Sequence, residues 1–143
     1  GGPGGPGGGV GLGGLGKGPP AWDAYGQAGV DQAHCFVGNQ WKKHYDTPLH
    51  QVVCRLTGSI FVVGSVDTTG PQLAARMQEL YEQMPHECIT TTGMMHRVQF
   101  TMSGAAAGLD EVEAKNWPAL YELCDARLRK VQASGGDRIG CAE

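Results

Sequence analysis

The residues best suited to chemistry in this 143-residue chain are its five histidines and five cysteines. His44, Asp46 and His50 lie within seven residues of one another, and His34 and Cys35 stand upstream of them. Zinc sites usually carry paired ligands at a short fixed spacing, such as Cys-x-x-Cys or His-x-x-x-His. Neither pairing occurs here, so we expect no metal ligand in the chain.

A cysteine nucleophile would need a thiol that can ionise and a histidine close to it in the fold. Cys54 and Cys124 fall on apolar faces of expected elements, where a thiol is hard to ionise. Cys35 or Cys88 would suit the role better, but no local signature supports either. The acidic cluster at 110–113 is interpreted as solvated charge in a loop. We therefore expect no catalytic residue and keep a small Cys/His enzyme as an alternative.

Glycine-rich strings near the N-terminus imitate two nucleotide-binding motifs. Gly9–Gly14 matches the dinucleotide fingerprint, and Gly11–Lys17 matches the opening of a phosphate-binding loop. Both chemistries need a strand before the loop and a helix after it, so that amide groups converge on phosphate. No apolar run precedes these glycines, and Gly18-Pro19-Pro20 follow them. We expect no nucleotide cofactor.

The charge balance argues against nucleic-acid and membrane partners. The chain has a formal charge of −3, with only 11 Lys and Arg residues, whereas phosphate backbones are bound by clustered cations. Arg127, Arg129 and Lys130 alternate with Glu122 and Asp125, a pattern interpreted as a solvated helix face. No apolar run reaches the roughly 20 residues of a membrane span. Five widely spaced cysteines indicate reduced thiols, so we expect a cytoplasmic protein, with the nucleus as an alternative.

Composition divides the chain into a tail and one domain. Twelve of the first 18 residues are glycine, which loses the most entropy on ordering and has nothing to bury in return. We predict a disordered Gly/Pro-rich tail over residues 1–31, an α+β domain over 32–134, and a flexible C-terminus over 135–143.

Residue periodicity predicts a mostly antiparallel sheet covered by two amphipathic helices. The first helix follows the capping residues before Pro71 and carries an apolar stripe from Leu73 to Met84. The second begins at Asn116, and Gly135-Gly136 end it. Residues 104–108 are predicted to form a loop. The predicted strands cover 33–37, 49–56, 59–66, 88–92 and 98–102.

The Arg55–Gly64 hairpin, together with the Leu73–Met77 helix segment, resembles proteasome assembly chaperone 4. A Thr-rich strand follows in that family, as Cys88–Thr92 does here, although the family's longer insertion is replaced by residues 93–97. The resemblance implies a non-enzymatic chaperone for the α-ring of the 20S proteasome. It implies two kinds of partner, a second small assembly chaperone in a heterodimer and the proteasome α subunits. An unrelated α+β adaptor or scaffold subunit is the other alternative.

An interface of this kind would use side chains around the hairpin and the short connection. Met94 and Met95 follow Gly93 at an expected turn, where methionine suits either the core or an adaptable contact surface. The candidate interface residues are Arg55, Thr57, Phe61, Met94 and Met95.

Overall fold

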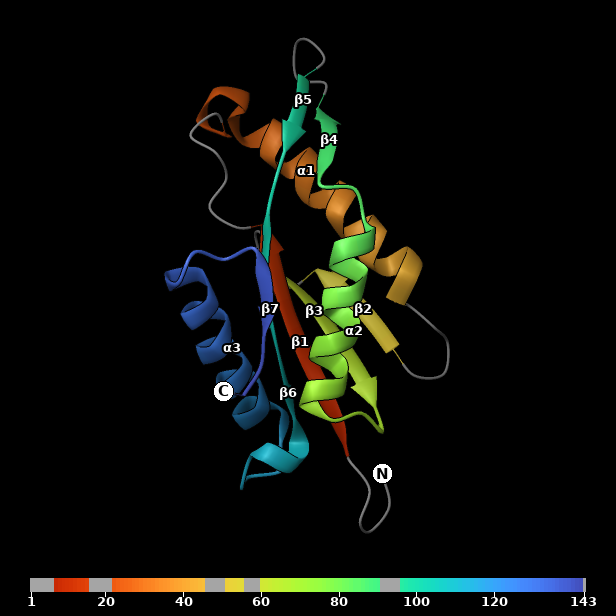
Figure 1. The fold of residues 1–143 in the computed structure, drawn as a ribbon, viewed down its shortest axis with the longest axis vertical. Coiled ribbons are helices and arrows are strands. Elements are labelled where there is room, and N and C mark those ends of the chain that lie inside the picture. The colour runs from red at the N-terminus through yellow and green to blue at the C-terminus, as the bar shows by residue number, and fades with distance from the viewer. Residues whose placement is uncertain (1–6, 16–21, 46–50, 56–59, 91–95, 143) are drawn as a thin grey trace.

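A five-stranded sheet of order β2-β3-β1-β6-β7 forms the centre of the fold (Figure 1). The structure is a computed structural model and describes residues 7–15, 22–45, 51–55, 60–90 and 96–142. The elements in chain order are β1 (Gly8–Leu15), α1 (Trp22–Tyr45), β2 (Gln51–Arg55), β3 (Ile60–Val66), α2 (Gly70–Gln83), β4 (Glu87–Thr90), β5 (His96–Gln99), β6 (Met102–Gly108), the 3-10 turn η1 (Leu109–Glu111), α3 (Trp117–Ala133) and β7 (Arg138–Gly140).

The predicted α+β class and mostly antiparallel sheet are confirmed. β1 pairs antiparallel with β3 and β6, β2 pairs antiparallel with β3, and β7 alone joins this sheet in parallel, beside β6. β4 and β5 form a separate two-stranded ribbon. Within the described ranges, none of the helices has both the length and the apolar character that a bilayer span requires.

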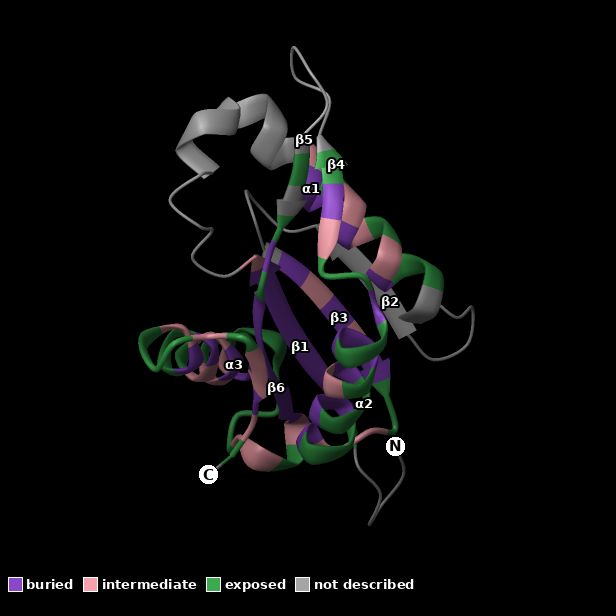
Figure 2. Ribbon diagram, turned by 45° about the horizontal axis from the view of Figure 1, so that its top comes forward, coloured by how far each residue is buried: buried purple, intermediate pink, exposed green. Residues whose placement is uncertain are grey.

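The strand β1 lies inside the segment that composition predicts to be a disordered tail. It is buried from residue 8 to residue 14 (Figure 2) and occupies the middle of the sheet. Val10 and Leu12 face α3, whereas Gly11 faces α2, where an added Cβ would lie 2.5 Å from the Met77 sulfur. Pairing with a strand on each side satisfies the backbone polar groups, and the helices cover both faces. For residues 8–15 the prediction of disorder is therefore wrong.

Helix α1 replaces the short strand predicted over residues 33–37. Ala33, Val37 and Trp41 are fully buried and lie four residues apart, which is the spacing of one helical face. Gly38 lets this face approach β3 closely, because a Cβ there would lie 2.7 Å from the Phe61 ring. The consecutive apolar residues at 35–37 suggested a strand and obscured the four-residue spacing of the helical face. The fold thus has a third helix beyond the two that periodicity predicts.

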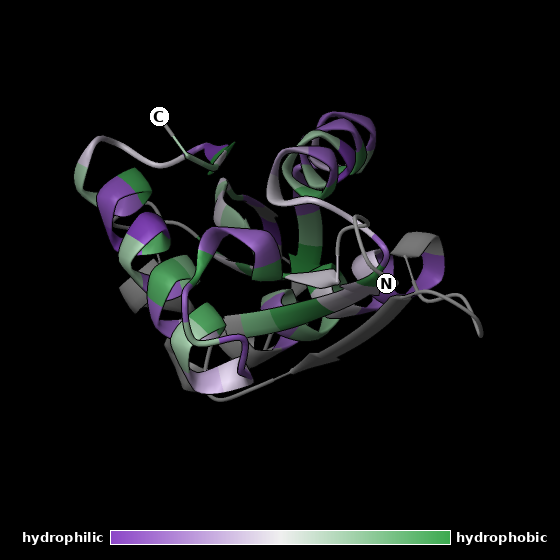
Figure 3. Cartoon of the chain, turned by 90° about the horizontal axis from the view of Figure 1, so that it is seen from below, coloured by the Kyte–Doolittle hydropathy of each residue, from purple (hydrophilic) through white to green (hydrophobic). Residues whose placement is uncertain are grey.

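Helices α2 and α3 match their predictions closely. Thr69 and Gln72 form a reciprocal capping box at the start of α2, and Asn116 caps α3. Both helices alternate apolar and polar residues (Figure 3) and lie on opposite faces of the sheet. The predicted stripe of α2 is buried, namely Leu73, Met77, Leu80, Tyr81 and Met84.

Strand β6 corrects the loop predicted at residues 104–108. Every residue of β6 is buried, and its alanines and glycines lie between α2 on one face and α3 on the other. A Cβ at Gly104 would collide with the Ile139 side chain, so small residues here permit close packing rather than a turn. β7 lies in the segment predicted as a flexible C-terminus, and that prediction is wrong for residues 138–140.

Candidate functional site

The interface residues predicted from sequence are only partly described by the structure. Arg55 ends β2 opposite Phe61 on β3. Phe61 is 3% exposed and packs edge-to-face against His34, so it belongs to the core. Thr57, Met94 and Met95 lie outside the described residues. The assignment of these five residues to an interface stays a prediction.

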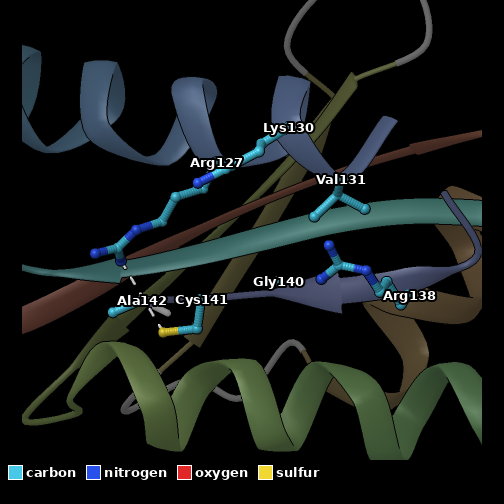
Figure 4. Close-up of a pocket in the computed structure, with 7 residues that line it drawn as sticks. All are labelled: Arg127, Lys130, Val131, Arg138, Gly140, Cys141 and Ala142. Carbon is cyan, nitrogen blue, oxygen red and sulfur yellow. Dashed lines mark hydrogen bonds between the residues drawn. The ribbon is translucent and has the colours of Figure 1, made fainter. Parts of the chain in front are cut away.

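A basic pocket of about 240 Å³ opens between α3 and β7 (Figure 4). Three of its lining residues are cations, and none is a carboxylate. We call this the α3–β7 pocket; its lining residues are Arg127, Lys130, Val131, Arg138, Gly140, Cys141 and Ala142.

A bidentate ion pair with Glu111 of η1 fixes the side chain of Arg127. Arg127 Nη2 lies 2.9 Å from Glu111 Oε1, and Arg127 Nη1 lies 3.0 Å from Glu111 Oε2. Arg127 Nη1 also donates to the carbonyl of Ala106, at 3.0 Å. The hydrogen bonds with Glu111 raise the pKa of Arg127, although burial lowers it. This arginine is therefore a rigid cation at one end of the pocket.

Glu111 is held in place as firmly as its partner. It also accepts a hydrogen bond from the Gly108 amide at 2.8 Å. The hydrogen bonds from Arg127 lower its pKa, while burial acts in the opposite direction. The side chains of Arg127 and Glu111 are only 16% and 19% exposed. The prediction of solvated charge at both residues is thus wrong, because α3 turns Arg127 toward the sheet edge.

The other end of the pocket is formed by β7. Arg138 Nη2 donates to Ser134 Oγ at 3.3 Å, at the exposed end of α3. Gly140 keeps the pocket open, because a Cβ at this position would collide with the Val131 side chain and lie 3.2 Å from Arg138 Nη1. Cys141 Sγ lies 4.0 Å from Arg127 Nη1, across the pocket (Figure 4).

The turn before β7 is anchored from the opposite face of the sheet. Tyr81 of α2 donates a 2.5 Å hydrogen bond to Asp137 Oδ1 and accepts one from the Met102 amide at 3.0 Å. Burial, followed by the hydrogen bond to Asp137, raises the pKa of Tyr81 to about 12. Asp137 adopts a left-handed φ of 60°, so this contact fixes an unusual backbone conformation next to Arg138.

The structure describes four of the five cysteine thiols. Cys35, Cys88, Cys124 and Cys141 are free thiols, and burial raises the pKa of Cys124 to about 12. No histidine lines the α3–β7 pocket. Over the part of the chain that the structure describes, no group of three or more His, Cys, Asp or Glu could hold a metal ion.

The comparisons with known proteins identify the fold. No family model matches the sequence. No curated protein matches it either. Among solved structures, the chain is similar to the GGDEF domain of YfiN from Pseudomonas aeruginosa, with a TM-score of 0.81 and 16% identity over 96% of this chain and 83% of that one. It is also similar to the active GGEEF domain of a diguanylate cyclase from Vibrio cholerae, with a TM-score of 0.68 and 12% identity over 94% and 82% of the two chains.

A third similar structure is the GGDEF domain of DgcB from Caulobacter crescentus in complex with c-di-GMP. Its TM-score is 0.71 and its identity 16%, over 94% of this chain and 75% of that one. At these identities the likeness establishes the fold, which is that of GGDEF domains.

This likeness corrects the predictions that rest on the chaperone resemblance. The recognition as proteasome assembly chaperone 4 is wrong, and the predicted α-ring function and proteasome partners are wrong with it. The expectation of a non-enzyme is also contradicted, since the matched structures include an active diguanylate cyclase domain. Of the functions predicted from the sequence, the small Cys/His enzyme is nearer to the matched diguanylate cyclase domain than the chaperone is.

Sequence reasoning missed Arg138 and misjudged Arg127. A signal was available for Arg138, since it directly follows the Gly135-Gly136-Asp137 turn that ends α3. Such a turn returns the chain to the sheet and can place the next side chain against the helix. No sequence signal marks the pairing of Arg127 with Glu111, which are 16 residues apart.

Proposed function

We propose that this chain acts in cyclic di-GMP signalling as a GGDEF-type domain that binds the dinucleotide. The observation that carries the proposal is the likeness to GGDEF domains over almost the whole chain, with a TM-score of up to 0.81. Several of the matched GGDEF structures concern a domain together with c-di-GMP.

The β2–β3 hairpin supports a nucleotide site at its end of the sheet. The names GGDEF and GGEEF spell a five-residue string, and Thr57–Phe61 agrees with it at Gly58 and Phe61. Arg55 is the last residue of β2, directly before this string in the sequence, and it carries a positive charge. An arginine can bind a phosphodiester through two parallel hydrogen bonds.

The acidic positions of that string are occupied differently in this chain. Ser59 and Ile60 stand where the names carry two acidic residues. Phosphoryl transfer generally uses magnesium held by carboxylates, and a hydroxyl with an alkyl group does not replace them. The residues of this hairpin do not fit such an ion, so no catalytic step through a metal is derived. The proposal concerns recognition of the nucleotide.

Calorimetric titration of the full chain with c-di-GMP tests this proposal. We expect saturable binding, weaker by about tenfold or more for the cyclic adenine dinucleotide, because a site that hydrogen-bonds guanine rejects a base that lacks its groups. Arg55→Ala should weaken c-di-GMP binding by about tenfold. Arg129→Ala is the matched control, since Arg129 lies on α3 and pairs with Asp125. Equal affinities for the two dinucleotides would refute the proposal.

A parallel incubation with GTP and magnesium measures synthesis directly. Chromatography of the products would detect c-di-GMP if the domain makes it. Product formation that depends on the chain would extend the proposal from recognition to catalysis. It would also show that the chain synthesises c-di-GMP without the two acidic residues that the names GGDEF and GGEEF contain.

A further inference from the structure

The sheet face that carries α3 is covered over only part of its width in the described structure. Helices α1 and α2 pack on the opposite face, where Phe61 and Val63 of β3 are buried. On its own face, α3 packs against β1, β6 and β7. The alternate residues of β3 point to that face, and they are the half-buried Val62 and Gly64 and the 49% exposed Val66. A Cβ at Gly64 would meet no atom within 4 Å.

The positions left open are apolar, although a strand face that meets water is normally polar. β2 is the edge strand beside β3, and the register pairs Val52 with Gly64 and Cys54 with Val62. None of these residues, nor Val66, carries a charge. We call this open area the β2–β3 face and define it by Val62, Gly64 and Val66 together with the two paired positions of β2. A contiguous apolar patch on a surface is typical of an interaction site.

Two aromatic residues on one flank of α3 border this face. Arg127 marks the flank toward β7, since its guanidinium lies 4.0 Å from the thiol of Cys141, directly after that strand. Tyr121 precedes Arg127 by six residues, which is about 120° around the helix axis, with the buried residues of α3 between them. Tyr121 therefore lies on the flank toward β3, and Trp117 lies one turn before it. These two aromatic residues are 37% and 59% exposed.

The start of α3 is level with the end of β3 that carries Val66. Cys124 Sγ lies 3.6 Å from the Val10 carbonyl, and Val10 pairs with Gly64. α3 begins shortly after β6 ends, and β1 pairs there with both the end of β6 and the end of β3. Tyr121, one turn before Cys124, is therefore level with Val66. The aromatic flank of α3 and the β2–β3 face form one surface.

The dimensions of this surface suit one helix. Neighbouring strands lie about 4.8 Å apart, so two strands are about 10 Å wide, which is the diameter of an α-helix with its side chains. Val62 to Val66 spans about 13 Å along β3. The resulting footprint of roughly 130 Å² is far below the about 800 Å² that each partner buries in a stable dimer of folded domains. A second copy of the chain would bury too little here, whereas a helix about 8–10 Å from α3 would complete the layer.

The residues around the face indicate the chemistry of that helix. Gly64 leaves a hollow that a Leu or Met side chain can fill, as anchors at i, i+3, i+4 and i+7 do when a helix lies in a groove. The rings of Tyr121 and Trp117 attract Lys and Arg side chains. Asp125, four residues after Tyr121, adds a carboxylate whose ion pair with Arg129 is at the surface. The helix should therefore carry an apolar row and a basic flank.

We propose that the β2–β3 face binds one amphipathic helix of a partner protein. The apolar row of that helix lies on Val62, Gly64 and Val66, and its basic flank lies beside Tyr121 and Trp117. It lies next to α3 and completes the second layer of helices on this face. The inference rests on the fold and not on the proposed function, so c-di-GMP binding can fail without affecting it.

The probe is a fluorescein-labelled peptide of about 18 residues, long enough to be helical, with leucine at i, i+3, i+4 and i+7 and lysine along both edges of that row. Fluorescence anisotropy measures its binding to the full chain, and amide chemical shifts locate it. Wild type should bind this lysine peptide, with the largest shifts in β3 and the first turns of α3. A matched peptide with glutamate in place of lysine should bind about tenfold more weakly, because it loses the attraction to the aromatic rings. A scrambled peptide of the same composition, without the apolar row, should not bind.

Variants of the chain place the binding on this face. Val66→Lys should weaken binding of the lysine peptide by about tenfold or more, because it puts a charge under the apolar row. Ile89→Lys is the matched control and should leave binding unchanged, since Ile89 is 52% exposed on β4, outside the β2–β3 face. Trp117→Ala should weaken binding by about fivefold. Val66→Ala serves if Val66→Lys fails to fold, and should weaken binding by about fivefold through lost apolar contact.

Sedimentation equilibrium of the chain alone tests the other occupant, a second copy. A monomer that binds the lysine peptide supports the inference, whereas a dimer that Val66→Lys dissociates would assign the face to self-association and overturn it. Equal affinity for the lysine and scrambled peptides, or binding that neither Val66 variant weakens, would also overturn it. So would the absence of binding to a chain shown to be folded by circular dichroism. Loss of c-di-GMP binding alone would refute only the proposed function.

Discussion

Replacing Gly11 by alanine should destabilise the protein, because β1 is the central strand and α2 packs directly on that glycine. The added Cβ would lie 2.5 Å from the Met77 sulfur and 2.9 Å from its methyl carbon. Overpacking of this kind costs about 1–3 kcal/mol. The smaller entropy of an unfolded alanine chain returns about 0.4–1 kcal/mol. We therefore expect a net loss of about 1–2 kcal/mol.

Gly64→Ala is the matched control for this experiment. Gly64 lies on the neighbouring strand β3, opposite Val10, and a Cβ there would have no atom within 4 Å. This variant should be neutral or slightly stabilising, by up to about 1 kcal/mol. Urea unfolding followed by far-ultraviolet circular dichroism gives both free energies of unfolding. If Gly11→Ala and Gly64→Ala had equal stabilities, residues 8–15 would not pack beneath α2, and the reasoning would be refuted.

Three further predictions concern ionisable groups with shifted pKa values. Glu111→Gln should cost about 1–3 kcal/mol at pH 7 in urea unfolding. Because Arg127 lowers the pKa of Glu111, this stabilisation is fully present above the ordinary glutamate pKa of 4.5 and is lost as the pH falls through the lowered pKa, so the difference between variant and wild type should shrink in acid. Tyr81→Phe should cost about 1–2 kcal/mol by losing its bond to Asp137. In wild type, absorbance at alkaline pH should show one tyrosine titrating near 12, and stability should fall above about pH 10, because the unfolded chain ionises first. Cys124 should resist thiol reagents until the protein unfolds, whereas fast labelling of Cys124 in the native state would contradict its burial.

Periodicity in the sequence was a reliable guide where helices and strands carry large apolar residues. The apolar stripe of α2, the cap at Asn116 and the β2–β3 hairpin follow from local spacing alone. The central strand could not be found this way. Gly9 and Gly11 are explained by the Leu73 and Met77 side chains of α2, which are more than 60 residues away in the chain. Glycine content therefore indicated disorder where it marks close packing.

The candidate site was harder to predict than the fold. Arg127 has the sequence context of a solvated helix face, and only the tertiary fold brings Glu111 against it. The antiparallel pairing of β2 with β3 was predicted correctly from the residue pattern, but the family resemblance based on these residues was wrong. A short string such as Arg55–Phe61 shares too few residues with any one family to decide between folds. The arrangement of all five strands decides it.

Binding of c-di-GMP to the full chain tests the central claim most directly. Isothermal titration should show one saturable transition with c-di-GMP, weakened by Arg55→Ala, unchanged by Arg129→Ala and about tenfold weaker or absent with the adenine dinucleotide. The absence of heat with c-di-GMP from a chain shown to be folded by circular dichroism would contradict the proposed function, even though the GGDEF fold would stand.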